Sequence, residues 1–514
     1  HLLVQTLDRG ELRPSGGFEG QYGILTLQDG RLSPFTLKDI AKLDYGGNGN
    51  ELGNHPPAQY KWMDFGNFGV RDANLSADFP TTAKLVMQLF QQEGGGPVDG
   101  DIQVTPVVIE QLLQITGPLH IKEYNETITA QNLEDKLHAY QQNYTLIGVQ
   151  QQITGTDTHQ TRKAFTNLVG SLLLDRAKHL QPRQLIDLGK LLLKDLKSRD
   201  LQVYFNNPVA EQWLAQNNYS GAMPQFTRGI DGFMVVQANV SISKAAQFVH
   251  STFNDQVTLD AQGGATHNLT ITLNYQQTGP IYGFNSYADY LRVYAPSNAQ
   301  LRYAYGFNTG QVLCTPNQTK PKPNPNPSPN PNPGPPPPGG KDDSSGSYTD
   351  AGIKISGCGT YYHMYPDSDY RSCSDGNYEL GYNGMQAKAW PVQRLGAPKQ
   401  LASDLPGYSM WGGMTLTPKN CVSTITLQWY VPRVVQNQPG QSPYQIIVGH
   451  QAGWPVTAQV HIDASALKGV KSLSYNQKIN VDTLVALAAR PMPNTPRPTT
   501  PTPGVTPTTP AKRP

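Results

Sequence analysis

Residues 80–104, PTTAKLVMQLFQQEGGGPVDGDIQV, carry the pattern that decides the fold of the N-terminal half. Pro80 suits the first turn of a helix, and apolar side chains recur behind it at helical spacing, at Ala83, Val86, Met87 and Phe90. Three consecutive glycines from residue 94 then stop the helix. Residues 101–104 follow as a short strand. The stretch therefore predicts a helix that leads directly into a strand.

The same alternation extends outward from this stretch over residues 2–204. Short apolar runs at 23–27, 119–121 and 201–205 read as strands, and they are separated by helical patterns. Strands that alternate with helices are typical of a layered α/β sheet. We therefore predict an α/β domain over residues 1–230.

The period of the pattern changes to two after Gly232. Runs rich in Thr, Tyr and Val at 233–236, 256–260 and 268–275 predict β-strands, and similar runs resume at 409–416 and 423–430. We predict an all-β sandwich whose two parts are residues 231–315 and 407–488.

A proline-rich tract separates the two predicted parts of the sandwich. Residues 316–340 are rich in Pro and Asn, which favours an extended polyproline II spacer without a core. Residues 341–406 are rich in Gly, Ser and Tyr. Residues 489–514 are a Thr/Pro-rich tail, the composition of an exposed stalk. We interpret 316–406 as an insertion within one sandwich.

All four cysteines lie in the C-terminal half, and none forms a Cys-x-x-Cys pair. An even number in a charge-poor chain favours two disulfides. Cys314 and Cys421 flank the insertion and Cys358 and Cys373 lie within it, so we prefer the pairs Cys314–Cys421 and Cys358–Cys373 among the three that four cysteines allow.

Composition restricts the function classes. Charged residues make up 15% of the chain and the net charge is +2, so a phosphate-binding basic groove is disfavoured and no nucleic-acid partner is expected. The polar character comes from Gln, Asn, Thr, Ser, Gly and Pro, which suits an extracytoplasmic protein. No run reaches the ~18 apolar residues of a membrane helix. We expect a membrane anchor upstream of His1.

Two segments are specific enough to carry a family resemblance. One is Glu11-Leu12-Arg13-Pro14-Ser15-Gly16-Gly17-Phe18, and the other is Arg71-Asp72-Ala73-Asn74-Leu75-Ser76-Ala77-Asp78-Phe79-Pro80. With residues 98–100, 116–118 and 162–165, they resemble a bacterial family of domains of unknown function, number 4012. The resemblance extends over residues 1 to about 310 and about 408–463. It implies a protein of the cell envelope.

The order of elements also resembles, more distantly, the LytR-CpsA-Psr phosphotransferases, which move glycans from polyprenyl pyrophosphate lipids to the cell wall. By that resemblance Arg13, Arg71 and Arg162 would bind pyrophosphate. Asp72 and Asp78 would hold Mg²⁺ or act as base. Gly16 and Gly17 would let the backbone approach the ligand.

Each of these residues also has a structural alternative. Arg71 and Asp72 could form an ion pair that fixes a loop, and Asp78 could cap the helix that Pro80 opens. Gly16 and Gly17 could form a turn, and Arg162 could lie on a solvated helix face.

Two functions therefore remain open at the level of sequence. The first is an extracytoplasmic envelope protein that binds a lipid-linked glycan and transfers it to cell wall, with Mg²⁺ as its cofactor. The second is a non-enzymatic surface protein, such as a subunit of a surface layer, filament or adhesin, whose partner is a second copy of itself.

Overall fold

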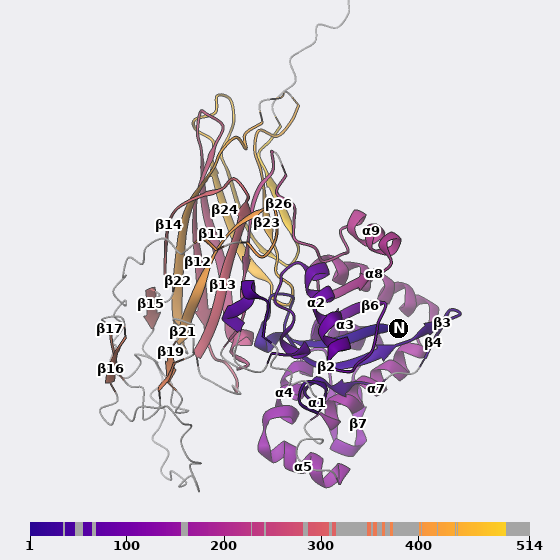
Figure 1. The fold of residues 1–514 in the computed structure, drawn as a ribbon. Helices are drawn as coiled ribbons and strands as arrows, with labels where there is room; N and C mark the ends of the chain where they lie inside the picture. The colour runs from indigo at the N-terminus through magenta and orange to yellow at the C-terminus, as the bar shows by residue number, and fades with distance from the viewer. Residues whose placement is uncertain are drawn as a thin grey trace, which may run out of the picture.

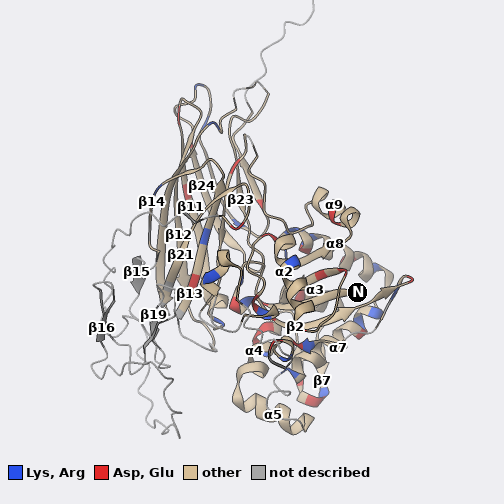
Figure 2. Cartoon of the chain, in the orientation of Figure 1, with Lys and Arg blue, Asp and Glu red and all other residues tan. Residues whose placement is uncertain are grey.

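The computed structural model describes residues 1–489 except 34–35, 47–54, 64–67, 156–162, 228, 241–242, 281–285, 308–310, 315–346, 351–352, 357–361, 365–370, 374–399, 402, 419, 437 and 439. The chain forms a mixed α/β part followed by a strand-rich part (Figure 1). Figure 2 shows that charged residues are sparse along the strands of the two large sheets.

A five-stranded sheet in the order β5-β2-β1-β6-β9 organises the α/β part. Its central strands β1 (Leu2–Asp8) and β6 (Gly100–Val104) run parallel. The outer strands β2 (Phe18–Leu25), β5 (Lys38–Asp39) and β9 (Leu201–Phe205) pair antiparallel. Two small hairpins lie outside the sheet: β3 (Leu27–Gln28) with β4 (Arg31–Leu32), and β7 (Leu119–Ile121) with β8 (Glu126–Ile128).

Helices cover both faces of this sheet. Alternate residues of a strand point to opposite faces, so Leu3 of β1 packs with Val86 and Phe90 of α2 (Phe79–Gln92) while Thr6 faces the other layer. That other layer contains α3 (Pro106–Thr116), α4 (Leu133–Gln142) and α7 (Ala164–Lys178). The remaining helices are α1 (Ile40–Gly46), α5 (Tyr144–Thr154), α8 (Pro182–Ser198) and α9 (Pro208–Gln216), with 3-10 turns at Arg9–Glu11, Ala58–Met63, Val70–Asp72, Lys122–Tyr124 and Ala245–Phe248.

The strand-rich part consists of two sheets around one core. One has the order β20-β21-β13-β10-β23-β26 and the other β14-β22-β12-β11-β24-β25, with β15 also paired to β22. Phe233, Trp411 and Trp429 are fully buried between them. The strands are β10 (Asp231–Val236), β11 (Val249–Leu259), β12 (Ala265–Tyr275), β13 (Ser286–Pro296), β14 (Gln300–Tyr305), β15 (Gln311–Cys314), β20 (Gln400–Leu401), β21 (Tyr408–Pro418), β22 (Cys421–Val431), β23 (Gln445–Gly449), β24 (Val456–Asp463), β25 (Leu473–Ile479) and β26 (Thr483–Ala486).

Strands from both sides of the proline-rich tract share these sheets. β13 pairs with β21, and β12 pairs with β22 along ten successive residue pairs. The tract at 316–340 and the tail from residue 490 lie outside the described residues. Within 341–406, the structure describes the hairpins β16 (Ser347–Asp350) with β17 (Ile353–Ser356) and β18 (Tyr362–Met364) with β19 (Arg371–Cys373).

The α/β part and the strand-rich part pack closely against each other. Trp62 stacks on Tyr290 of β13, with ring centroids 4.6 Å apart. The buried Arg292 of β13 donates to the carbonyl oxygen of Leu75 at 2.7 Å. The Arg199 guanidinium lies 2.7 Å from the Asp482 carboxylate. The two parts therefore share a continuous, partly charged interface.

Within the described part of the chain, no helix combines the length and the apolar character needed to cross a bilayer.

A buried ionic triad lies within the core of the strand-rich part. His267 contacts Asp255 at 2.7 Å and Asp231 at 3.1 Å through its two ring nitrogens, and all three side chains are fully buried. Its ring stacks on Trp429 at 4.5 Å, and the Tyr444 hydroxyl donates to Asp231. Burial lowers the pKa of His267, but the two carboxylates outweigh it and raise the pKa to about 10. The side chain of His267 is therefore protonated in the folded protein at neutral pH.

This triad predicts a loss of stability at alkaline pH. Because the folded pKa of His267 is above its unfolded value, its contribution is complete below about pH 6.5 and is lost as the pH rises through 10. We expect the free energy of unfolding to fall by on the order of 3 kcal/mol between pH 7 and pH 10. Urea unfolding followed by circular dichroism measures it. In the Asp255→Asn variant, this fall in the free energy of unfolding should be about half as large. An equal fall in the parent protein and the variant would contradict the role assigned to the His267 triad.

Candidate functional site

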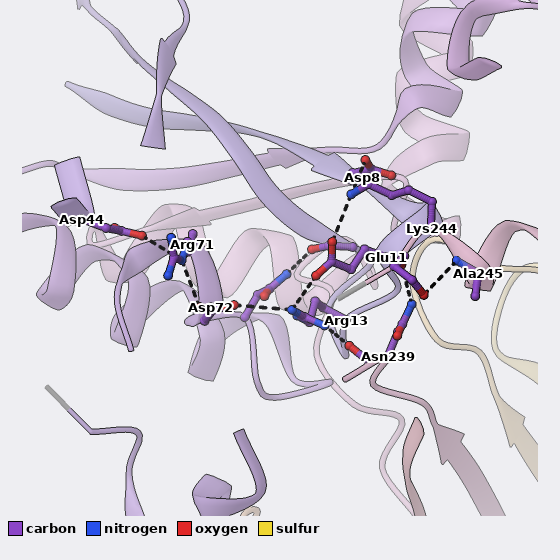
Figure 3. A network of polar contacts seen from close by, with 12 residues as sticks. Asp8, Glu11, Arg13, Asp44, Arg71, Asp72, Asn239, Lys244 and Ala245 are labelled. Carbon is purple, nitrogen blue, oxygen red and sulfur yellow. Dashed lines mark hydrogen bonds and ion pairs between the residues drawn. The ribbon is translucent and has the colours of Figure 1, made fainter. Parts of the chain in front are cut away.

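The segment that follows β1 brings a row of charged side chains to the boundary between the two parts. Asp8 ends β1, the 3-10 turn Arg9–Glu11 follows, and Arg13 lies two residues further on. The Asp8 carboxylate accepts from the backbone N–H of Gly10 at 2.9 Å and caps this turn. The turn points Arg13 toward Asn239 and Glu11 toward Lys244, both of which belong to the strand-rich part (Figure 3).

These side chains form a chain of ion pairs in which acidic and basic groups alternate (Figure 3). Glu11 is 2.9 Å from Arg13 on one side and 3.0 Å from Lys244 on the other. From Arg13 the chain continues through Asp72 and Arg71 to Asp44, at 3.5, 3.2 and 3.4 Å. From Lys244 it continues to Asp8 at 2.9 Å, and from Asp8 to His138 at 2.9 Å.

The ion-pair chain is largely buried, and its pKa values reflect that. Burial raises the pKa of Asp8, but His138 and Lys244 outweigh it and hold the pKa well below its usual range. Burial lowers the pKa of His138, and the attraction of Asp8 more than offsets it, so the net shift is upward. Burial raises the pKa of Asp72 despite the nearby Arg13 and Arg71.

A cavity of about 330 Å³ begins where this chain of ion pairs ends. It lies between the sheet and the helices α3, α4 and α7. The aliphatic residues of its lining include Leu37, Val104, Ile109, Leu133, Leu137, Val169 and Leu173. Asp8, His138 and Lys244 also line it, as do Asp39 and Lys163, which pair at 2.6 Å. The cavity is thus apolar over most of its wall and charged at defined places.

Gly170 on α7 keeps part of this cavity open. A Cβ atom built at this position would lie 3.4 Å from Leu37 Cδ1 and would project into the cavity. The size of the cavity falls within the range of roughly 300–1,000 Å³ that is usual for small-molecule sites.

Two of the three predicted phosphate-binding arginines come together. Arg13 and Arg71 both contact Asp72, one through each carboxylate oxygen. Arg13 is 2% exposed, and it also donates to the carbonyl oxygen of Asn239. Both guanidiniums therefore have structural partners inside the protein. Arg162 lies outside the described residues.

Asp78 takes the capping position that the sequence left open. Its carboxylate accepts from the backbone N–H and the hydroxyl of Thr81, at 3.1 and 2.6 Å, and from the N–H of Met223 at 3.1 Å. The carboxylate of Asp72 is already used by two guanidiniums. As arranged, Asp72 and Asp78 do not fit a Mg²⁺ site, and no cluster of three or more His, Cys, Asp or Glu in the described ranges could hold a metal ion.

Gly16 and Gly17 form a tight turn between β1 and β2. Their φ values are 123° and 156°, and a Cβ atom at Gly17 would approach the carbonyl oxygen of Asp8 to 2.5 Å. Gly16 packs against Ala452 and Gly453 of the strand-rich part. The two glycines allow the charged segment to fold back on the end of β1.

Lys244, His138 and the cavity were not found from the sequence. Lys244 and His138 lie 233 and 127 residues from Glu11, and neither belongs to a recognisable motif. The cavity depends on how three helices pack on the sheet. Glu11 did give a signal, because it precedes Arg13 in the segment that carried the family resemblance.

Comparison with known families bears on the same region. Residues 1–141 match the family described as "Protein of unknown function (DUF4012)". The match confirms the predicted resemblance over this range, which contains β1, β2, β6 and α2–α4, with Glu11, Arg13, Asp72 and His138. No curated protein matches the chain.

The ion-pair chain predicts a large effect of removing Arg13. Arg13→Ala leaves the carboxylates of Glu11 and Asp72 buried without their shared partner, so we expect a loss of about 3–5 kcal/mol in the free energy of unfolding. The exposed Arg31 of β4 provides the control, because Arg31→Ala should change the free energy by no more than about 0.5 kcal/mol. Urea unfolding of both variants measures this. A loss below about 1 kcal/mol in Arg13→Ala would contradict a structural role for the chain.

Proposed function

We propose that the chain is an extracytoplasmic protein of the cell envelope that binds a polyprenyl-linked glycan through the lipid part of that molecule. The single observation that carries this proposal is the cavity between the sheet and α3, α4 and α7. Its aliphatic wall suits a hydrocarbon chain, since apolar surface is favourably transferred from water into such a site.

The charged residues in the cavity wall suit the polar end of the polyprenyl-linked glycan. Lys244 and His138 both have raised pKa values, because each lies beside the Asp8 carboxylate and that attraction outweighs the effect of burial. Lys163 adds a third basic group on the lining. A phosphate at this end would contact cations that are already held in place by carboxylates. The resemblance to LytR-CpsA-Psr phosphotransferases supplies the ligand class.

The arrangement favours binding over transfer of the glycan. Arg13 and Arg71 would neutralise phosphate charge in a transferase, yet each is bonded to an internal carboxylate. Asp72 and Asp78 are likewise used by structural contacts. We therefore propose a lipid-binding role, and we retain the non-enzymatic surface protein as the second candidate. The composition of residues 316–340 and 489–514, typical of spacers and stalks, favours that candidate.

A cavity-filling substitution tests the lipid site directly. Gly170→Met adds a side chain that occupies the space beside Leu37, so we expect at least a tenfold loss of bound lipid. The protein is produced in a bacterial host with its membranes, purified, and its lipid extract is analysed by mass spectrometry. Polyprenyl phosphate added to the purified protein and detected by native mass spectrometry provides the second readout.

Gly148→Met is the matched control. Gly148 also lies in a helix, it does not line the cavity, and a Cβ atom there meets nothing within 4 Å. The Gly148→Met variant should bind lipid as the parent protein does. Absence of polyprenyl phosphate from the parent protein in both readouts, or an equal loss in the two variants, would overturn the proposal.

We also infer that a Cys314–Cys421 disulfide joins β15 to β22 at the base of the insertion. The backbone register supports it, because Cys314 lies directly opposite Cys421 in this antiparallel pair. Cys373 is in β19, and Cys358 lies outside the described residues. Peptide mapping without reduction should recover one fragment that contains both Cys314 and Cys421. Recovery of either cysteine as a free thiol would contradict the pair.

A further inference from the structure

Apolar side chains are exposed on the surface of α8. Ten large apolar residues are exposed in the described part of the chain; three of them lie on this helix and three on α5. Leu185, Ile186 and Leu193 are 52%, 61% and 46% exposed. In Figure 1, α8 lies on the side of the α/β part that faces away from the long strands β11 and β12.

A row of basic residues is interleaved with these apolar side chains. Arg183, Lys190, Lys194 and Lys197 are all exposed. Residues 186, 190, 193 and 197 are spaced by three or four, so Ile186 and Leu193 share one face of the helix with Lys190 and Lys197.

The acidic residues of α8 do not balance this face. Asp195 is 1% exposed and accepts from Gln111 of α3 at 2.8 Å, so it points into the protein. Asp187 is partly exposed and lies 3.7 Å from Lys190. The outer face of α8 therefore has four basic groups and one acidic group.

Neither a solvated helix face nor the edge of a core accounts for both the exposed apolar side chains and the basic residues of α8. A solvated helix face needs no exposed leucine or isoleucine, and the edge of a core needs no row of lysines. α5 illustrates the difference, because Val149 and Ile153 are exposed there on a helix that has no charged residue. A basic amphipathic helix with exposed aliphatic side chains is typical of one that lies on a membrane surface.

We propose that α8 docks on an anionic lipid surface. The basic row would attract the negatively charged headgroups, and Ile186 and Leu193 would enter the boundary between headgroups and acyl chains. The helix is suited to this contact because it is fixed to the rest of the molecule. Gln111 binds Asp195 near its C-terminal end, and the next residue after α8, Arg199, binds Asp482. The proposal does not depend on a ligand in the cavity.

Vesicle co-sedimentation of the full chain tests this surface. The protein is mixed with vesicles of phosphatidylglycerol and phosphatidylcholine or with vesicles of phosphatidylcholine alone. We expect binding to the anionic vesicles, little binding to the neutral ones, and a loss of binding as salt is raised, because screening weakens contacts between exposed charges.

Two variants separate the basic row from the apolar one. Lys190→Gln with Lys197→Gln should reduce partition onto anionic vesicles about tenfold or more. Ile186→Ser with Leu193→Ser should reduce it about tenfold by removing the inserted side chains. Circular dichroism and thermal unfolding establish that each variant is folded.

Each variant has a matched control. Lys468→Gln with Lys471→Gln removes two exposed charges from the strand-rich part, and Val149→Ser with Ile153→Ser removes two exposed apolar side chains from α5. Both controls should bind vesicles as the parent protein does. Lack of binding to anionic vesicles at low salt would overturn the proposal, as would equal losses in the α8 variants and their controls.

Discussion

The chain of alternating charges from Asp44 to His138 is the constraint on which the relation of the two parts depends. Glu11 and Arg13 come from the segment after β1, while Lys244 and Asn239 come from the strand-rich part. Buried charges are tolerated only when each has a partner. Separating the two parts would leave Glu11, Asp8 and Arg13 without some of theirs, so the ion pairs oppose separation of the two parts. Gly16 and Gly17 allow this contact by turning the chain back on β1.

The same chain of charges also fixes one side of the cavity. Asp8, His138 and Lys244 belong both to the ion-pair chain and to the cavity lining. The strand-rich part therefore contributes, through Lys244, to a site that is otherwise built by the sheet and helices of the α/β part. A ligand that entered the cavity would meet basic groups whose positions are set by internal carboxylates.

Local pattern was enough to predict the helix that Pro80 opens and many of the strands, and too little to predict the site. Pro80 and the three glycines from residue 94 lie close to the first and last residues of α2, because helix caps and helix breakers act within a few residues. The helices α1, α5 and α9 were not predicted, since their apolar patterns are short or weak. Arg13, Arg71 and Asp72 do meet, as their motifs suggested. Lys244 and His138, which pair with Glu11 and Asp8, could not be foreseen, because pairing over more than 100 residues depends on tertiary packing. Asp78 was predicted correctly by one of its two interpretations. The sequence suggested that it could cap a helix, and in the structure it makes that contact.

The central claim is that the cavity beside Asp8, His138 and Lys244 holds the hydrocarbon part of an amphiphilic ligand. A crystal structure of the protein saturated with polyprenyl phosphate measures this most directly. The account predicts continuous density along Val104, Leu137 and Val169, with the phosphate within hydrogen-bonding distance of Lys244 or His138. Ordered water in the cavity, with the lipid absent or bound elsewhere on the molecule, would contradict it.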